Sequence, residues 1–229
     1  MDHPQPGRPV PAKPFLNFIL HQHGRALVAL LTGLTYADIL RFRFVYDDYP
    51  LVVANPRLAS WHYLPLYFKT DIFSHYLANP LIHYYRPIFS MWLFINHTLF
   101  GLHPSGWHAL NVILHLTATV LVWNFVERLT TNRIVAFFAT LLFGLHPIHT
   151  EVVVWISSCS EMLLTIFVLF SLLCVMRAAA SANRIGWRTG SLVSYAAALL
   201  TKETAIMLPA AVFLLDGSTW QRRPVIRTN

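Results

Sequence analysis

The sequence predicts an all-α fold, that of a polytopic helical membrane protein. The 229 residues are 55% hydrophobic and only 12% charged, and the mean hydropathy is +0.50. A soluble domain carries about 25% charged residues, so this chain has too little polar surface to cover a water-soluble globule. Its hydrophobicity also excludes a disordered chain. A net charge of +7 can indicate a nucleic-acid-binding protein, but in a chain this apolar the excess Lys and Arg residues mark cytoplasmic loops. We therefore expect no nucleic acid partner.

Residues 1–25 contain five prolines and three basic residues and are interpreted as a cytoplasmic N-terminal tail. Residues 26–216 form the predicted transmembrane domain, whose first span covers about 26–44. Residues 217–229 are interpreted as a cytoplasmic C-terminal end that is truncated. The two cysteines, Cys159 and Cys174, fall in apolar surroundings and are expected to be packing residues, not a disulfide.

The segment of about 45–107 is predicted to be a large first non-cytoplasmic loop. It contains six prolines, which break any long span, and ten aromatic residues between Trp61 and Trp92. Trp and Tyr prefer the membrane–water interface. We therefore expect short helices that lie on the bilayer, with the apolar 88–100 segment interfacial or re-entrant.

The remaining apolar stretches predict five further crossings, which gives six in total, two of them short. They cover 107–126, 134–145 continued by 152–156, 163–176, 192–200 and 205–215. With the N-terminus placed in the cytoplasm, 11 of the 17 Lys and Arg residues fall inside and six of the ten acidic residues fall outside. This distribution follows the positive-inside rule and supports the orientation.

Charges that interrupt apolar segments of a membrane protein need a functional or structural reason, because burying them in lipid is costly. Here they converge on the outer face, where short and broken segments predict a cavity. The candidate residues are Asp47, Asp48, Arg86, His146, His149, Glu151, Glu161, Lys202 and Glu203.

Each of these residues also has a structural interpretation. A carboxylate of the Asp47–Asp48 pair can act as a general base toward a hydroxyl, but the pair also suits a solvated turn. Arg86 and Lys202 can bind phosphate, although Lys202 and Glu203 equally suit an ion pair at a bend. His146, His149 and Glu151 are metal-capable, but Pro147 disrupts their helical spacing, so we favour hydrogen bonding and assign no metal site.

Five strings in this order resemble the N-terminal membrane part of the transmembrane and tetratricopeptide-repeat family, a member of the GT-C class of glycosyltransferases. The match covers roughly 26–216. The strings are FVYDDYPL at 44–51, YRP at 85–87, HALN at 108–111, LHPIHTE at 145–151 and LTKETA at 200–205.

The resemblance implies a GT-C-like fold and transfer of a sugar from a polyprenyl phosphate to a protein or glycan hydroxyl outside the cytoplasm. It implies that Asp48 or Asp47 is the catalytic base. It also implies that Arg86, His146, His149, Glu151, Glu161, Lys202 and Glu203 bind the lipid phosphate or the acceptor. The resemblance assigns no definite cofactor and leaves a divalent cation open, and it implies the bacterial inner membrane or that of the endoplasmic reticulum.

Two departures from the family pattern matter. Cys159 stands where the relatives carry Arg, two residues before Glu161, and no 34-residue helical repeat follows Asp216. The alternative is therefore a non-catalytic membrane scaffold or assembly protein with a degenerate GT-C fold. A small transporter is disfavoured, because the charges gather at one face and do not form a path through every span.

Overall fold

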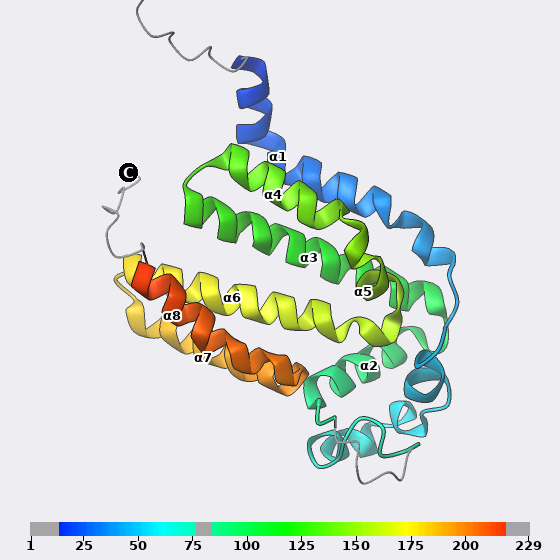
Figure 1. Cartoon of the computed structure of the whole chain (residues 1–229). Helices are drawn as coiled ribbons and strands as arrows, with labels where there is room; N and C mark the ends of the chain where they lie inside the picture. Colours follow the sequence, from blue (N-terminus) through cyan, green and yellow to red (C-terminus); the bar gives the residue numbers. More distant parts are fainter. Residues whose placement is uncertain (1–13, 77–83, 219–229) are drawn as a thin grey trace, which may run out of the picture.

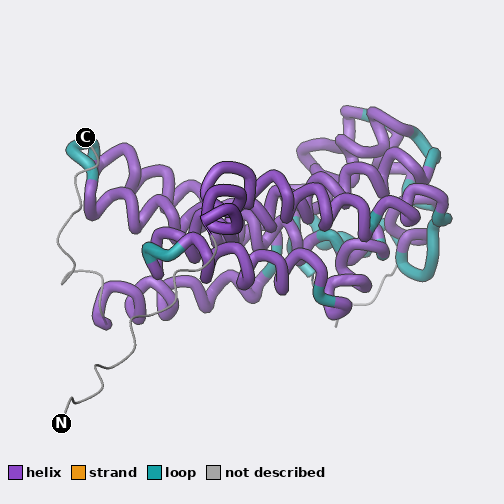
Figure 2. The backbone as a smooth tube through the Cα atoms, turned by 90° about the horizontal axis from the view of Figure 1, so that it is seen from above, coloured by secondary structure: helices purple, strands orange, loops and turns teal. Residues whose placement is uncertain are grey.

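The computed structural model describes residues 14–76 and 84–218, which are helical and contain no β-strand. Six helices run side by side, and α2 (Pro87–Phe100) and the short helical segments gather at one end of them (Figures 1 and 2). The six are α1 (Pro14–Thr35), α3 (Pro104–Thr130), α4 (Arg133–Leu145), α6 (Ser160–Ala180), α7 (Arg184–Thr201) and α8 (Leu208–Ser218). The all-α prediction is confirmed. Residues 1–13 of the predicted tail and 219–229 of the predicted C-terminal end lie outside the described residues.

Successive long helices alternate in direction, so the connections fall at two opposite ends of the molecule (Figure 1). The α3–α4 turn is tight because Thr131 adopts a left-handed conformation with φ 55° and Asn132 caps α4. Its side-chain oxygen accepts hydrogen bonds from the backbone N–H groups of Ile134 and Val135. Asn183 caps α7 in the same manner, through Gly186 N–H. We refer to the end that carries these turns as the turn end.

Two helical stretches of the described chain are long and apolar enough to cross a membrane. They are Pro104–Thr130, with mean hydropathy 1.7, and Ile156–Ala180, with mean hydropathy 2.3. Arg133–Leu145 and Pro147–Val154 pass the same test as a pair, bent by 45° at their junction. The 13 residues of α4 rise only about 20 Å, short of the ~30 Å hydrocarbon core, so α4 needs its continuation. The number of crossings stays a prediction.

The first predicted span differs in its boundaries from the helix that the structure shows. The α1 helix begins at Pro14, inside the expected tail, and ends at Thr35. Proline suits a helix start because its fixed φ and missing N–H cost nothing there. Beyond Thr35 the chain forms a short 3-10 helix, η1 (Ala37–Arg41), and then becomes extended at Phe42.

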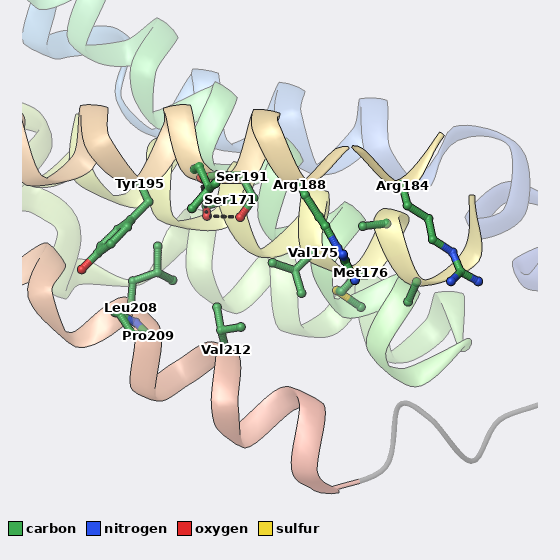
Figure 3. Close-up of a pocket in the computed structure, with 13 residues that line it drawn as sticks. Ser171, Val175, Met176, Arg184, Arg188, Ser191, Tyr195, Leu208, Pro209 and Val212 are labelled. Carbon is green, nitrogen blue, oxygen red and sulfur yellow. Dashed lines mark hydrogen bonds between the residues drawn. The ribbon is translucent and has the colours of Figure 1, made fainter. Parts of the chain in front are cut away.

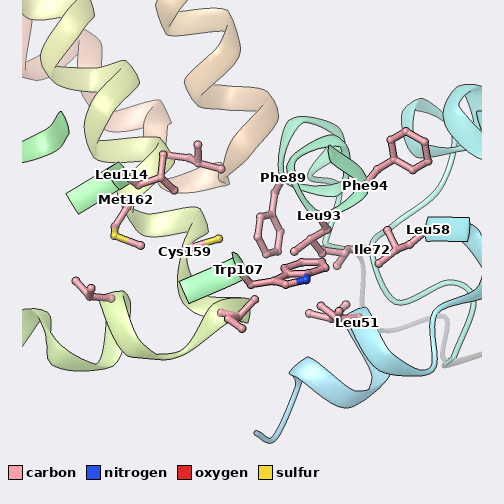
Figure 4. Close-up of a cluster of buried hydrophobic side chains, with 14 of the residues drawn as sticks. Leu51, Leu58, Ile72, Phe89, Leu93, Phe94, Trp107, Leu114, Cys159 and Met162 are labelled. Atoms are coloured by element: carbon pink, nitrogen blue, oxygen red, sulfur yellow. The ribbon is translucent and has the colours of Figure 1, made fainter. Parts of the chain in front are cut away.

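The predicted outer loop packs into a hydrophobic core that it shares with residues of α3 and α6. Its elements are η2 (Tyr49–Val53), η3 (Pro56–Ala59), η4 (Trp61–Phe68) and α2 (Pro87–Phe100). Leu51, Leu58, Phe89 and Trp107 are buried together in this core (Figure 4). Burial of these apolar side chains against one another and against α3 stabilises the packed loop. How these segments lie relative to the bilayer stays a prediction.

Candidate functional site

The candidate site residues come from separate segments that meet at the end of the molecule opposite the turn end (Figure 1). Asp47 and Asp48 directly precede η2, and Arg86 directly precedes α2. The residues from His146 to Glu151 lie in η5 (Pro147–His149) and α5 (Thr150–Val154) or flank them. Glu161 is in the first turn of α6, Lys202 follows α7, and Glu203 opens η7 (Glu203–Met207). We refer to this end as the site end.

The two adjacent aspartates have different environments. Asp47 is exposed, whereas Asp48 has an exposed fraction of 0%. Tyr46 adopts a positive φ of 46°, which an L-residue rarely does. This turns the chain so that Asp48 Oδ2 accepts a hydrogen bond from Val45 N–H at 3.0 Å. The turn thus buries one carboxylate and leaves its neighbour at the surface.

Asp48 connects the loop to a segment far along the chain. Its Oδ1 accepts two hydrogen bonds from Ser157, one from the backbone N–H at 2.8 Å and one from the hydroxyl at 2.5 Å. Ser157 belongs to η6 (Ile156–Ser158), which directly precedes α6. Burial raises the pKa of the Asp48 carboxyl, while the hydrogen bonds from Ser157 and Val45 lower it. With both oxygens engaged, Asp48 has the geometry of an anchor.

Four charged candidates form two ion pairs between different elements. The Arg86 guanidinium donates two hydrogen bonds to Glu203, from Nη2 to Oε1 at 2.6 Å and from Nε to Oε2 at 3.1 Å. This hydrogen bonding lowers the pKa of Glu203. Lys202 pairs with Glu161. The structure thus pairs Lys202 and Glu203 with residues of other elements and not with each other.

The histidine segment caps its own turn and packs on aromatic rings. His146 Nδ1 accepts a hydrogen bond from Ile148 N–H at 3.1 Å. His149 lies with its ring centroid 4.5 Å from Phe143 and 5.5 Å from His115. Glu151 is exposed. Within 14–76 and 84–218, no three His, Cys, Asp or Glu residues are placed to hold one metal ion.

A cavity of about 430 Å³ beside the aspartate loop contains cations that sequence reasoning did not assign to the site. Arg41 and Arg43 line it together with His103 and Tyr49. Neither arginine has a carboxylate partner among the described side chains. Both lie near the end of the first predicted span, which covers about 26–44. Tyr49, which directly follows Asp48, also lines this cavity, whereas neither aspartate does.

Cys159 and Cys174 are both buried and unpaired, as predicted. Cys159 lies in the hydrophobic core of the outer loop, next to Met162 and Trp107 (Figure 4). The position two residues before Glu161 therefore carries a buried thiol, which interacts with the Trp92 side chain and with Asp48, so this chain supplies no cation there.

Comparison with known proteins identifies the family of the chain. The sequence profile described as dolichyl-phosphate-mannose-protein mannosyltransferase matches residues 85–228. Human protein O-mannosyl-transferase TMTC2 is 31% identical over 86% of this chain, and Drosophila melanogaster protein O-mannosyl-transferase Tmtc1 is 32% identical over 90%. Mouse protein O-mannosyl-transferase TMTC1 is 36% identical over 66% of this chain.

The aligned regions make up 24% of the human and fly proteins and 16% of the mouse protein, so the chain spans at most about a quarter of these relatives. No solved structure matches the chain. The profile match nevertheless extends over more than half of the 229 residues and includes the Arg86, Glu161 and Lys202 segments. The chain is a membrane protein with a helical GT-C-type fold, and it belongs to the dolichyl-phosphate-mannose-protein mannosyltransferase family.

Proposed function

We propose that this chain is the catalytic membrane part of a glycosyltransferase that moves mannose from a polyprenyl phosphate to a protein hydroxyl. One observation carries the proposal: in a chain of this family, an exposed carboxylate and two sets of cations meet at one end of the bundle. Transfer takes place on the non-cytoplasmic face, of the endoplasmic reticulum or of a bacterial inner membrane. The basic residues of the turn end support this orientation, because such residues mark the cytoplasmic side.

Asp47 is the general base in this proposal and Asp48 is a positioning residue. A general base must come within hydrogen-bond reach of the hydroxyl whose proton it takes, and Asp47 is open to an acceptor. Asp48 is fully buried and already accepts three hydrogen bonds. It holds the loop, and hence Asp47, against η6. The hydroxyl oxygen then attacks the anomeric carbon, its proton passes to Asp47, and the bond to the phosphate oxygen breaks.

The leaving phosphate needs cations, and two groups of them are proposed. Arg41 and Arg43 line the cavity beside the loop and can bind a phosphate without losing a carboxylate partner. Arg86 and Lys202 bind it only if the phosphate displaces Glu203 or Glu161. Arginine forms bidentate hydrogen bonds with phosphate oxygens, which stabilises the charge that develops on them. His146, His149 and Glu151 are proposed to contact the acceptor.

The direct test is mannose transfer by the whole chain in membranes, with polyprenyl-phosphate mannose as donor and a Ser/Thr peptide as acceptor. Asp47→Asn is expected to reduce transfer at least about 100-fold, the typical contribution of a general base, with membrane insertion and donor binding unchanged. Asp38→Asn is the matched control, because Asp38 is an exposed acid that we assign no role. Full activity of the Asp47→Asn variant would refute the assignment.

A non-catalytic scaffold is the second candidate, and one observation favours it. The cations Arg86 and Lys202 are already paired with carboxylates of the chain itself. A scaffold would bind the donor lipid without turnover, or not at all. Donor binding by the wild-type chain together with no transfer above the Asp47→Asn level would therefore favour the scaffold over the enzyme.

A further inference from the structure

A large cavity lies between α6, α7 and α8, away from the candidate site. It has a volume of about 850 Å³ and is lined by residues of all three helices. Val175, Leu208 and Val212 provide apolar surface along it (Figure 3). Ser171 and Ser191 lie in its middle, but their hydroxyls are hydrogen-bonded to each other at 2.8 Å. The middle of the cavity therefore offers little unsatisfied polarity.

One end of the cavity is strongly basic. Arg184 and Arg188 lie one turn apart on α7, near one another at this end of the cavity (Figure 3). Both are exposed and have no carboxylate partner among the side chains described. The sequence from Met162 to Lys202 contains no Asp or Glu. Glu127, an acid of the same turn end, is already paired with Arg25 and Arg133.

The position of this basic end separates it from the candidate site. Glu161 stands at the first turn of α6, and α6 ends near the basic end of the cavity, 21 residues after it begins. Those residues rise about 30 Å, which equals the thickness of a bilayer core. The two arginines thus lie at the membrane interface opposite to the one where the carboxylates gather.

We propose that the cavity binds an anionic phospholipid, with the phosphate headgroup on Arg184 and Arg188 and one acyl chain along Val175, Leu208 and Val212. A free phosphate would use the arginines but not the apolar walls. A neutral lipid would use the walls but not the arginines. An anionic lipid uses both, and basic pockets between membrane helices on the cytoplasmic side are known to bind such headgroups. The ligand belongs to the leaflet opposite to the proposed transfer reaction.

The test is titration of the whole purified chain in detergent with phosphatidylglycerol or phosphatidylcholine of identical acyl chains, with bound lipid counted by native mass spectrometry. We expect a preference for phosphatidylglycerol of roughly tenfold to thirtyfold, as two phosphate-binding arginines at a membrane surface would provide. The double variant Arg184→Gln/Arg188→Gln is expected to lose this preference, and Arg184→Lys/Arg188→Lys to retain most of it.

Two matched controls locate the binding. Arg25→Gln removes one charge from the same end of the molecule, outside the cavity, and is expected to leave the preference unchanged, whereas Arg188→Gln reduces it. Val212→Trp fills the apolar part and is expected to weaken phosphatidylglycerol binding at unchanged charge, with the melting temperature confirming that the variant folds.

Three results would overturn the proposal. The first is equal binding of the two lipids by the wild-type chain. The second is an equal loss of preference in Arg25→Gln and Arg188→Gln, which would indicate nonspecific attraction to a basic surface. The third is complete displacement of the lipid by inorganic phosphate at the same concentration, which would show that the apolar walls contribute nothing.

Discussion

The hydrogen bonds between Asp48 and Ser157 give the sharpest test of how the site loop is held. We predict that Ser157→Ala destabilises the protein, because it removes the hydroxyl that donates to Asp48 Oδ1 at 2.5 Å. The backbone N–H bond from the same residue remains. A hydrogen bond to a charged group contributes about 1.5–3 kcal/mol. For a chain of this size, each kcal/mol shifts the melting temperature by about 2–4 °C, so the expected decrease is about 3–12 °C.

The assay is thermal unfolding of the purified chain in one detergent, with Ser158→Ala as the matched control. Ser158 is the next residue and is equally half-buried, and its hydroxyl makes no hydrogen bond within the described part of the chain. Its variant is expected to melt within about 1 °C of wild type, the range of a neutral substitution. Equal melting temperatures for the two variants would refute the anchoring role of Ser157.

The loss of stability caused by Ser157→Ala should also depend on pH. The hydrogen bond from Ser157 lowers the pKa of Asp48, so its loss raises that pKa and destabilises the ionised carboxylate. The difference from wild type is therefore largest above the folded-state pKa of Asp48. It shrinks as the pH falls and the carboxyl is protonated in both proteins. A deficit that grows toward low pH would contradict this explanation.

Two further predictions concern helix packing and the outer ion pair. Gly144→Ala is expected to destabilise the protein by about 1–3 kcal/mol, because a Cβ there would press on the Thr32 hydroxyl and lie 3.3 Å from a Thr119 methyl group. Gly33→Ala, whose Cβ would meet only Leu116 methyl groups at 3.9 Å, should instead stabilise α1 by about 0.5–1 kcal/mol. Chemical denaturation measures the change in the free energy of unfolding for both variants. Changes of the same sign in the two variants would contradict this packing. A double-mutant cycle of Arg86→Gln and Glu203→Gln should give a coupling of about 0.2–1 kcal/mol, since Glu203 is 58% exposed. That coupling should vanish as the pH falls through the lowered pKa of Glu203, and a pH-independent value would argue against an ion pair.

Much of the fold could be predicted from the sequence, because long apolar stretches and loop charges follow directly from the physics of the bilayer. The predicted span at 107–126 lies within α3, and the one at 134–145 coincides with α4 except for its first residue. The meeting of Asp47, Arg86, Glu161 and Lys202 at one end also follows from counting crossings. The packing partners of the outer-loop aromatics could not be predicted, since an aromatic residue at an interface and one in a core have the same composition.

The partners of the charged residues could not be predicted. Adjacent aspartates look alike in sequence, and only the positive φ of Tyr46 determines that Asp48 is buried and Asp47 exposed. Likewise, adjacent Lys202 and Glu203 suggest an ion pair with each other. In the structure, Lys202 pairs with Glu161 and Glu203 pairs with Arg86. These choices depend on three-dimensional distances between elements more than 40 residues apart.

The Asp48–Ser157 contact also has a consequence for biosynthesis. The two residues are 109 positions apart, and ribosomes add about 5–20 residues per second. The aspartate loop therefore waits about 5–20 s, already inserted, before the segment that fixes it has been made. During this interval a carboxylate that ends fully buried is open to water and to chaperones. A nascent chain arrested before residue 157 would thus contain α1 and α3 but leave its aspartate loop unanchored.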